Sequence, residues 1–274
     1  MFGAIDIGGT KTLLSTFDES GKLTENIRFE TPKNYIEFIK EVESQSVNID
    51  ISKLKVMSVA IPGLLNKIKG IGIAFGNLPW ENIPIKKDVE KIFKCPVLIE
   101  NDAKLAGLSE AIELKKKYHK VLYITVSTGI GGGLIIDNKI DPDFDTMEVG
   151  HMLFEHDGKL QEWEKFASGR AIVAKFGKPA KDITDKKDWY IIAHNIAVGL
   201  IDLIATLTPD VIIIGGGVGS HFEKFEDRLN EDLKIYESNL LTIPPILKAQ
   251  NAEQAVIYGG YYLGKYNYEQ SNYK

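Results

Sequence analysis

The 274-residue chain has almost no cysteine, no excess of positive charge and no long hydrophobic run. Its single cysteine, Cys95, excludes an intrachain disulfide framework and any metal site built from several cysteines. The formal net charge of −5 provides no basic field for nucleic acid or for an anionic membrane surface. No apolar stretch approaches the ~20 residues that span a bilayer, and the first residues lack the basic segment of a signal peptide. These absences predict a cytoplasmic protein that binds neither nucleic acid nor membrane.

A Walker A sequence is also absent, but the N-terminus has a different glycine-rich turn. Two β-rich runs, 2–7 and 11–17, flank Gly8-Gly9-Thr10, which predicts a tight hairpin. Backbone amides at such a tip can approach a phosphate closely, although an ordinary β-turn explains the glycines equally well. Asp6 would repel a phosphate unless a cation lay between them, so the sequence predicts Mg²⁺ beside Asp6.

An apolar run at 96–99 predicts a buried strand that delivers Asn101 and Asp102 to its carboxyl end, before a helix-like segment at 104–117. Open α/β sheets bind ligands outside such strand ends. Asn and Asp are also preferred N-cap residues, so capping of the following helix is the alternative. Beside a bound phosphate, a carboxylate here is expected to accept a proton from an attacking hydroxyl.

A second pattern of strand, glycine turn and strand begins at residue 121. Runs at 121–126 and 133–136 flank a turn that contains Thr128 and Gly129, and they repeat the order of residues 2–17. The repeat predicts an internal duplication with a nucleotide between paired phosphate loops. The length of the chain likewise favours two domains around one cleft.

A third glycine run follows a predicted helix at 188–207 and a predicted buried strand at 211–214. This run includes Gly216 and Gly217, and close approach of a ligand to the backbone here would suit adenosine or its phosphates. Beyond it, a helical period runs to about residue 263, and the Tyr- and Asn-rich tail from Lys265 is predicted to fray.

Other polar positions leave alternatives open. Glu148 and His151 are three residues apart, so one ligand could contact both, while a structural histidine is the alternative. Asn77 follows a glycine, which is typical of a turn residue, although its amide could contact a polar ligand. Trp80 is more typical of a core side chain than of a platform for a sugar ring.

Taken together and in this order, the motifs resemble those of the ROK family of sugar kinases, over a region from Gly3 to about Leu263. The segments that carry the resemblance are Asp6-Ile7-Gly8-Gly9-Thr10-Lys11, Ile61-Pro62-Gly63, Asn77-Leu78-Pro79-Trp80, Glu100-Asn101-Asp102-Ala103, Thr128-Gly129-Ile130-Gly131-Gly132-Gly133, Glu148-Val149-Gly150-His151, and Glu164 before Ser168-Gly169. The resemblance implies an α/β fold, the duplicated actin/hexokinase-like (ribonuclease H-like) two-domain fold with a central cleft. It places a small domain at 1–110, completed by a C-terminal helix at about 253–274, and a large domain at 111–252.

The resemblance also implies roles for individual residues. It makes Asp102 the catalytic base, and it assigns sugar contacts to Asp102 itself and to Gly63, Asn77, Asn101, Glu148, His151 and Glu164. With the glycine run above, it assigns ATP contacts to Asp6, Gly8, Gly9, Thr10, Lys11, Thr128, Gly129, Gly216 and Gly217, with Mg²⁺ held near Asp6 through water.

One region departs from the family pattern. Many members hold a structural zinc with the His and a cysteine-rich run, but the cysteine positions here are Glu155, Asp157 and Glu162, and only Gly158 of that run is kept. Carboxylates without a thiolate are a poor match for structural zinc, so we expect no zinc and a role for His151 in sugar contact or loop support. The loop before Glu148 also lacks the family's usual glycines, and no helix-turn-helix precedes Phe2, so the repressor branch is not expected.

The function that these expectations support is transfer of phosphate from MgATP to a hexose, glucose at the 6-hydroxyl being the first candidate. A kinase for N-acetylhexosamine or fructose and a glucokinase that uses polyphosphate remain open. So do a non-catalytic sugar sensor and an α/β protein whose glycine turns bind nothing. Family members are often dimers, so a homodimer is also open, and the expected partners are otherwise only sugar and nucleotide.

Overall fold

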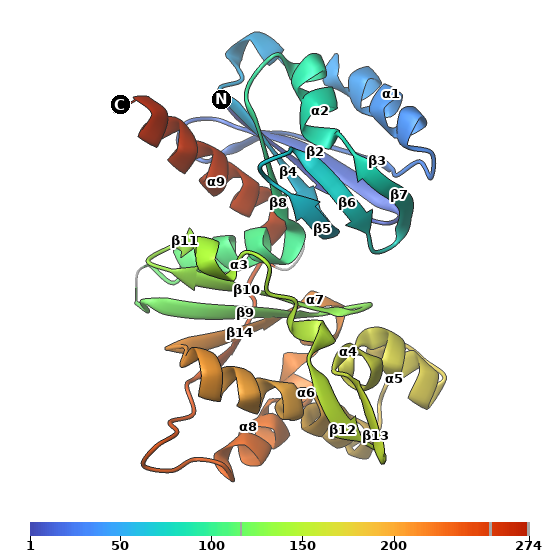
Figure 1. Cartoon of the computed structure of the whole chain (residues 1–274), viewed down its shortest axis with the longest axis vertical. Helices are drawn as coiled ribbons and strands as arrows, with labels where there is room; N and C mark the ends of the chain where they lie inside the picture. The colour runs from blue at the N-terminus through green and yellow to red at the C-terminus, as the bar shows by residue number, and fades with distance from the viewer. Residues whose placement is uncertain (116, 252–253, 273–274) are drawn as a thin grey trace. The chain divides into compact units, whose positions relative to one another are not determined.

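The computed structural model of the chain describes residues 1–115, 117–251 and 254–272, and it divides into two compact units (Figure 1). Unit 1 is Met1–Ser109 with Glu253–Lys274, and unit 2 is Glu110–Ala252. The helix predicted at 104–117 is α3, Asp102–Glu113. Residue 116 of that prediction, and residues 252, 253, 273 and 274 near the predicted C-terminal helix, lie outside the described residues.

Unit 1 is built on a five-stranded sheet in the order β3-β2-β1-β4-β8, with a separate three-stranded sheet, β5-β6-β7. Strands β1, β2 and β3 are antiparallel, whereas β1, β4 and β8 are parallel. The elements of unit 1 are β1 (Phe2–Ile7), β2 (Lys11–Phe17), β3 (Leu23–Glu30), α1 (Tyr35–Ser46), η1 (Ile51–Lys53), β4 (Val56–Ile61), β5 (Gly63–Asn66), β6 (Ile71–Phe75), β7 (Leu78–Ile83), α2 (Ile85–Phe93), β8 (Val97–Asn101), the start of α3, and α9 (Ala255–Asn272).

Alternate residues of β1 point to opposite faces of this sheet, and the residues on each face are buried in a core of their own. Ile5 and Ile7 belong to a core that includes Phe38 of α1 and Phe93 of α2. Phe2 and Ala4 belong to a second core with Ile257 and Tyr261 of α9. Accordingly, α9 covers one face of the sheet, while α1 and α2 lie on the other (Figure 1).

Unit 2 repeats this topology. Its sheet has the order β11-β10-β9-β14-β15, in which β9, β10 and β11 are antiparallel and β9, β14 and β15 are parallel. The same strand order and the same directions confirm the duplication predicted from the sequence. The elements of unit 2 are β9 (Lys120–Val126), β10 (Ile130–Ile136), β11 (Lys139–Ile140), η2 (Pro142–Phe144), η3 (Val149–His151), β12 (Leu153–His156), β13 (Lys159–Glu162), α4 (Glu164–Ala167), α5 (Gly169–Phe176), η4 (Ala180–Asp182), α6 (Lys186–Leu207), β14 (Val211–Gly215), α7 (Gly216–Gly219), η5 (Phe222–Lys224), α8 (Glu226–Lys234) and β15 (Ile246–Lys248), in addition to the end of α3.

Helix α6 is the central helix of unit 2. Within the described residues it is the one helix that is long and apolar enough to cross a bilayer by length and composition. This corrects the prediction that no apolar stretch approaches the length of a membrane span. Half of its most apolar window is buried in the protein, as expected for a core helix. Its Asn195 is fixed there, because the side-chain amide donates to Phe166 O (2.9 Å) and the Asn195 carbonyl accepts the Trp163 indole N–H (2.9 Å).

The structure also corrects the prediction for the C-terminal tail. The segment from Lys265 is not frayed, because α9 continues to Asn272. Edge-to-face contacts of the Phe2 ring with Tyr261 and Tyr268 hold this last part of the helix on the sheet.

Candidate functional site

In unit 1, strand β8 ends at the two polar residues that the sequence analysis singled out. Asn101 caps α3, because its Oδ1 accepts the N–H groups of Ala103 (2.9 Å) and Lys104 (3.2 Å). Its Nδ2 donates to Gly63 O at 3.3 Å, so both ends of this amide are held by the backbone. The capping alternative is therefore confirmed for Asn101. Asp102 begins α3, and the N–H of Ala103 donates to its Oδ1 (2.8 Å), which orients the carboxylate.

Asp6 lies near the end of β1, two strands away from β8 in the same sheet. Burial, and to a lesser extent the charge of Asp102, raise the pKa of Asp6 from its usual 3.8 to about 7. The negative charges of the two carboxylates repel each other, and a hard divalent cation would lower this repulsion. Their oxygen donors are also those that Mg²⁺ prefers, so the residues present fit this ion.

The β1–β2 hairpin is a tight turn whose glycines are required. The N–H of Gly8 donates to Lys11 O (3.0 Å), so the hairpin itself uses this amide, and a Cβ on Gly8 would lie 2.6 Å from the same oxygen. Thr10 and Lys11 are exposed. Lys33, which the sequence analysis missed, reaches the tip and donates to Gly9 O (2.7 Å), so an ammonium group lies beside the expected phosphate loop.

The sugar-side loops predicted in unit 1 lie on the three-stranded sheet. Gly63 has φ +151°, and a Cβ there would lie 2.2 Å from Ala74 O, so only glycine fits. Asn77 is exposed and packs against the β1–β2 hairpin, since a Cβ on Gly9 would lie 2.6 Å from Asn77 Cβ. Trp80 is buried among Phe38 and Phe75, so its predicted place in the core is confirmed.

In unit 2, Glu164 lies at the β9–β10 turn. A Cβ on Gly129 would lie 2.6 Å from Glu164 Oε2, and the same oxygen accepts the N–H of Ile130 (3.4 Å). Gly150 packs onto this turn as well, because a Cβ there would lie 2.2 Å from Ile130 O. The predicted Glu-x-Gly-His segment and the second glycine turn therefore meet at Glu164.

Glu148 is the exposed residue before η3, and His151 ends that helix. His151 Nδ1 lies 3.1 Å from Glu162 Oε1, and donor atoms of His151, Glu162 and Glu164 lie within 4.8 Å of one another. In the part of the chain that the structure describes, this group could hold a metal ion. It contains no thiolate, and the Lys165 ammonium lies 3.6 Å from Glu162 and 3.9 Å from Glu164, so its charge and donors are a poor match for structural zinc.

The region of the family's cysteine-rich run is a β12–β13 hairpin. Its turn residues Asp157 (φ +52°) and Gly158 (φ +72°) both have positive φ. The His156 ring stacks on Phe166 with centroids 4.2 Å apart, and its Nε2 lies 3.3 Å from Asn195 Oδ1. Packing and hydrogen bonds thus fix the hairpin to the core of unit 2.

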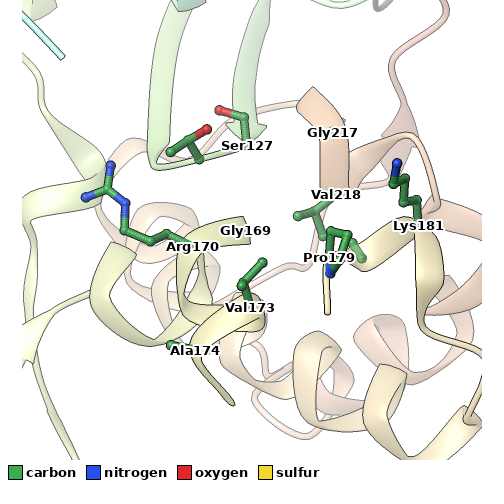
Figure 2. Close-up of a pocket in the computed structure, with 11 residues that line it drawn as sticks. Ser127, Gly169, Arg170, Val173, Ala174, Pro179, Lys181, Gly217 and Val218 are labelled. Atoms are coloured by element: carbon green, nitrogen blue, oxygen red, sulfur yellow. The ribbon is translucent and has the colours of Figure 1, made fainter. Parts of the chain in front are cut away.

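A cavity of about 690 Å³ opens in unit 2 between the β9–β10 turn, α5, η4 and α7 (Figure 2). Gly216 at the start of α7 has φ +82°, and a Cβ there would lie 2.5 Å from Val126 O. Gly217 borders the cavity with open space where a side chain would be. Arg170 and Lys181, which the sequence analysis did not single out, extend from two sides of the cavity (Figure 2). The other lining residues are Ser127, Thr128, Gly169, Val173, Ala174, Pro179, Ala180 and Val218.

The predicted residues are divided between the two units. Unit 1 contains Asp6, Gly8, Gly9, Thr10, Lys11, Gly63, Asn77, Asn101 and Asp102, and unit 2 contains Thr128, Gly129, Glu148, His151, Glu164, Gly216 and Gly217.

Comparisons with known proteins agree with this architecture. A glucokinase of Streptomyces coelicolor is 26% identical over an alignment of 300 positions, and this alignment covers 93% of this chain and 94% of that protein. The N-acetyl-D-glucosamine kinase of Histophilus somni is 28% identical, over 94% of this chain and 97% of that protein. The crystal structure of a ROK family glucokinase from Streptomyces griseus, in complex with glucose and AMPPNP, has a TM-score of 0.78 at 23% identity and covers 96% of this chain and 98% of that one. The model of the ROK family matches residues 2–266. This chain therefore belongs to the ROK family, and it has the duplicated actin/hexokinase-like fold.

Proposed function

We propose that this chain, a ROK-family sugar kinase, transfers the γ-phosphate of ATP to the 6-hydroxyl of a hexose, with glucose as the first candidate. The observation that carries the proposal is the carboxylate pair of unit 1, in which Asp102 follows a parallel strand and lies close enough to raise the pKa of Asp6. The similar glucokinase of Streptomyces coelicolor supports glucose, and the N-acetyl-D-glucosamine kinase of Histophilus somni supports an N-acetylhexosamine as the alternative.

In the proposed reaction, Asp102 accepts the proton of the sugar hydroxyl as its oxygen attacks the γ-phosphorus. The N–H of Ala103 holds one oxygen of that carboxylate, which limits the orientations the group can take. Phosphoryl transfer depends mainly on positioning and electrostatic stabilisation, so a base held in place contributes more than a mobile one.

Phosphate charge is handled by the two glycine hairpins. In unit 1 we assign this role to the tip at Gly8, Gly9, Thr10 and Lys11, and in unit 2 to Thr128 and Gly129. Asp6 would hold Mg²⁺, through water, and the bound ion would supply positive charge to neutralise the phosphates.

The remaining assignments concern the two substrates. The cavity of unit 2 takes the adenosine part of ATP against Gly216, Gly217 and the largely apolar walls of α5 and η4. The sugar hydroxyls are oriented by Gly63, Asn77, Asn101, Glu148, His151 and Glu164. Of these, Asn101 acts mainly through the backbone, since its amide is bonded to Gly63, Ala103 and Lys104.

The test is a coupled assay of the purified chain with Mg²⁺, with ATP or polyphosphate as donor and with glucose, N-acetylglucosamine, N-acetylmannosamine and fructose as acceptors. We expect ATP-dependent turnover that is fastest with glucose. Turnover with none of these sugars, despite sugar binding, would contradict the kinase assignment and favour a sensor.

The matched variant is Asp102→Asn, which keeps the shape of the side chain but cannot take the proton. We expect kcat to fall by about 10²–10⁴-fold, the usual contribution of a general base, with little change in the KM of either substrate. Near-normal turnover would remove Asp102 from the catalytic role and leave the fold assignment intact.

A further inference from the structure

A charged pair in unit 1 has no role in the mechanism above. Lys67 lies in the turn that follows β5, and its Nζ donates a hydrogen bond to Glu100 Oε2 on β8. The side chain of Glu100 is only 3% exposed, whereas that of Lys67 is 33% exposed. A carboxylate so deeply buried is strongly unfavourable unless it is paired, so the contact constrains the turn that provides the lysine.

The other oxygen of Glu100 connects this pair to the candidate catalytic residues. Glu100 Oε1 accepts the N–H of Asn101 at 2.9 Å, and Asn101 is the residue before Asp102. Asn101 Nδ2 in turn donates to Gly63 O. Two polar connections therefore join the β5 segment, at Gly63 and Lys67, to the last residues of β8.

The backbone already holds Gly63 beside β8, because β4 pairs with β8 as far as Ile61 and Asn101, and β5 begins two residues after Ile61. Strands β5, β6 and β7 form their own sheet, so the hydrogen bond from Lys67 to Glu100 connects the turn after β5 to β8.

We propose that Lys67, acting through Glu100, is a positioning residue that fixes the backbone at Asn101 and therefore the orientation of Asp102. The inference rests on the proposed function, since it assumes that Asp102 acts on the sugar. Loss of the lysine removes this partner of the buried Glu100 carboxylate and lets Glu100 move away from the Asn101 N–H, and displacements of about 1 Å at a reacting centre can cost about a hundredfold in rate.

The experiment compares Lys67→Met, which keeps the length of the side chain, with Lys67→Arg, which restores the charge. Lys69→Met is the matched control, because Lys69 is an exposed lysine in the same turn. We expect Lys67→Met to lower kcat at least tenfold and to raise the KM of the sugar, with the KM of ATP unchanged. Lys67→Arg should recover most of the loss, and Lys69→Met should behave as wild type.

A double-variant cycle with Glu100→Gln tests whether the lysine acts through Glu100. The double variant should lose less activity than the product of the two single losses, because glutamine leaves no buried charge unpaired. Wild-type kcat and sugar KM in Lys67→Met, or fully multiplicative losses in the cycle, would overturn the proposal.

Amide hydrogen exchange separates this proposal from the proposed function, because it needs no turnover. In Lys67→Met we expect faster exchange at 67–70 and 101–104, with β1 and β2 unchanged. If wild type turns over no sugar, the proposed function fails while this exchange pattern still supports the connection between the turn after β5 and β8. Unchanged exchange at 101–104, or a uniform increase across unit 1, would overturn it.

Discussion

At the scale of single residues, the most informative feature is the pair Asp6 and Asp102. Asp6 lies in β1 and Asp102 begins α3 directly after β8 of the same sheet, and burial followed by the charge of Asp102 disfavours the charged form of Asp6. A carboxyl group whose pKa is about 7 carries a proton in a large share of molecules near neutral pH. A divalent cation held at Asp6 would displace that proton, so metal binding there would be coupled to proton release.

This coupling predicts how stability depends on pH. The pKa of Asp6 is raised from 3.8 to about 7 in the folded protein, so folding favours the protonated form. The stabilisation is complete below about pH 4 and is lost as pH rises through 7. We expect Asp6→Asn, measured by urea unfolding without Mg²⁺, to remove this part of the pH profile and to exceed wild type in stability at pH 8 by up to about 4 kcal/mol. A variant with the wild-type slope between pH 4 and 7 would contradict the assignment of the shifted pKa to Asp6.

The sequence predicted those candidate residues that follow strand or turn patterns, such as Asp6, Asp102 and the hairpin glycines. It could not predict Lys33, Lys67, Arg170 or Lys181. A lysine or arginine has a long side chain, and the tertiary fold rather than its neighbours in sequence determines where its charged end lies. Glu164 was found through the resemblance alone, because a glutamate at a helix start has no distinctive local pattern.

At the scale of elements, the turn between β14 and α7 shows two adjacent glycines with different requirements. Gly216 has φ +82° and no room for a Cβ, whereas a side chain on Gly217 would enter open space at the cavity. We expect Gly217→Val to fold normally but to raise the KM of ATP roughly tenfold or more, because the new methyl groups occupy volume assigned to adenosine. The KM of the sugar should not change.

Gly216→Val is the companion variant, and thermal unfolding is the measurement. Its strained backbone and steric overlap should lower stability by roughly 1–3 kcal/mol. If Gly217→Val leaves the KM of ATP at the wild-type value, the cavity beside α7 is not the adenosine site.

The sequence analysis did not predict strand β3 or the β12–β13 hairpin. Strand β3 is largely exposed, with only Phe29 buried, so it lacks the apolar alternation of an inner strand. The β12–β13 hairpin did have a local signal, since Asp157-Gly158 is a favoured two-residue hairpin turn.

At the scale of the whole molecule, one sheet topology occurs twice, but only unit 1 is assembled from two separate parts of the chain. The chain leaves unit 1 within α3 and returns for α9, which covers one face of the first sheet. Unit 2 has its own core, to which Trp163 and Trp189 belong, and it needs no residue from α9 for that core. The duplication was readable from the order of strands and glycine turns, whereas the extent of α9 was not, because its tyrosines pack on residues at the other end of the chain.

This asymmetry predicts that damage to α9 destabilises unit 1 selectively. A Cβ on Gly259 would lie 1.9 Å from Leu105 O in α3, and backbone cannot yield as a flexible side chain does. Gly259→Val is therefore expected to displace α9 and to lower the stability of unit 1 by about 1–3 kcal/mol or more. Limited proteolysis should then cut unit 1 first and leave a protected fragment of about 110–251. Gly264→Ala is the control, because its Cβ would meet only side-chain atoms, Ser58 Oγ at 3.2 Å and atoms of Val56 and Phe2 at the ordinary contact distances of 3.6 and 3.7 Å. Equal protection of the two units in Gly259→Val would show that α9 is not what holds unit 1 together.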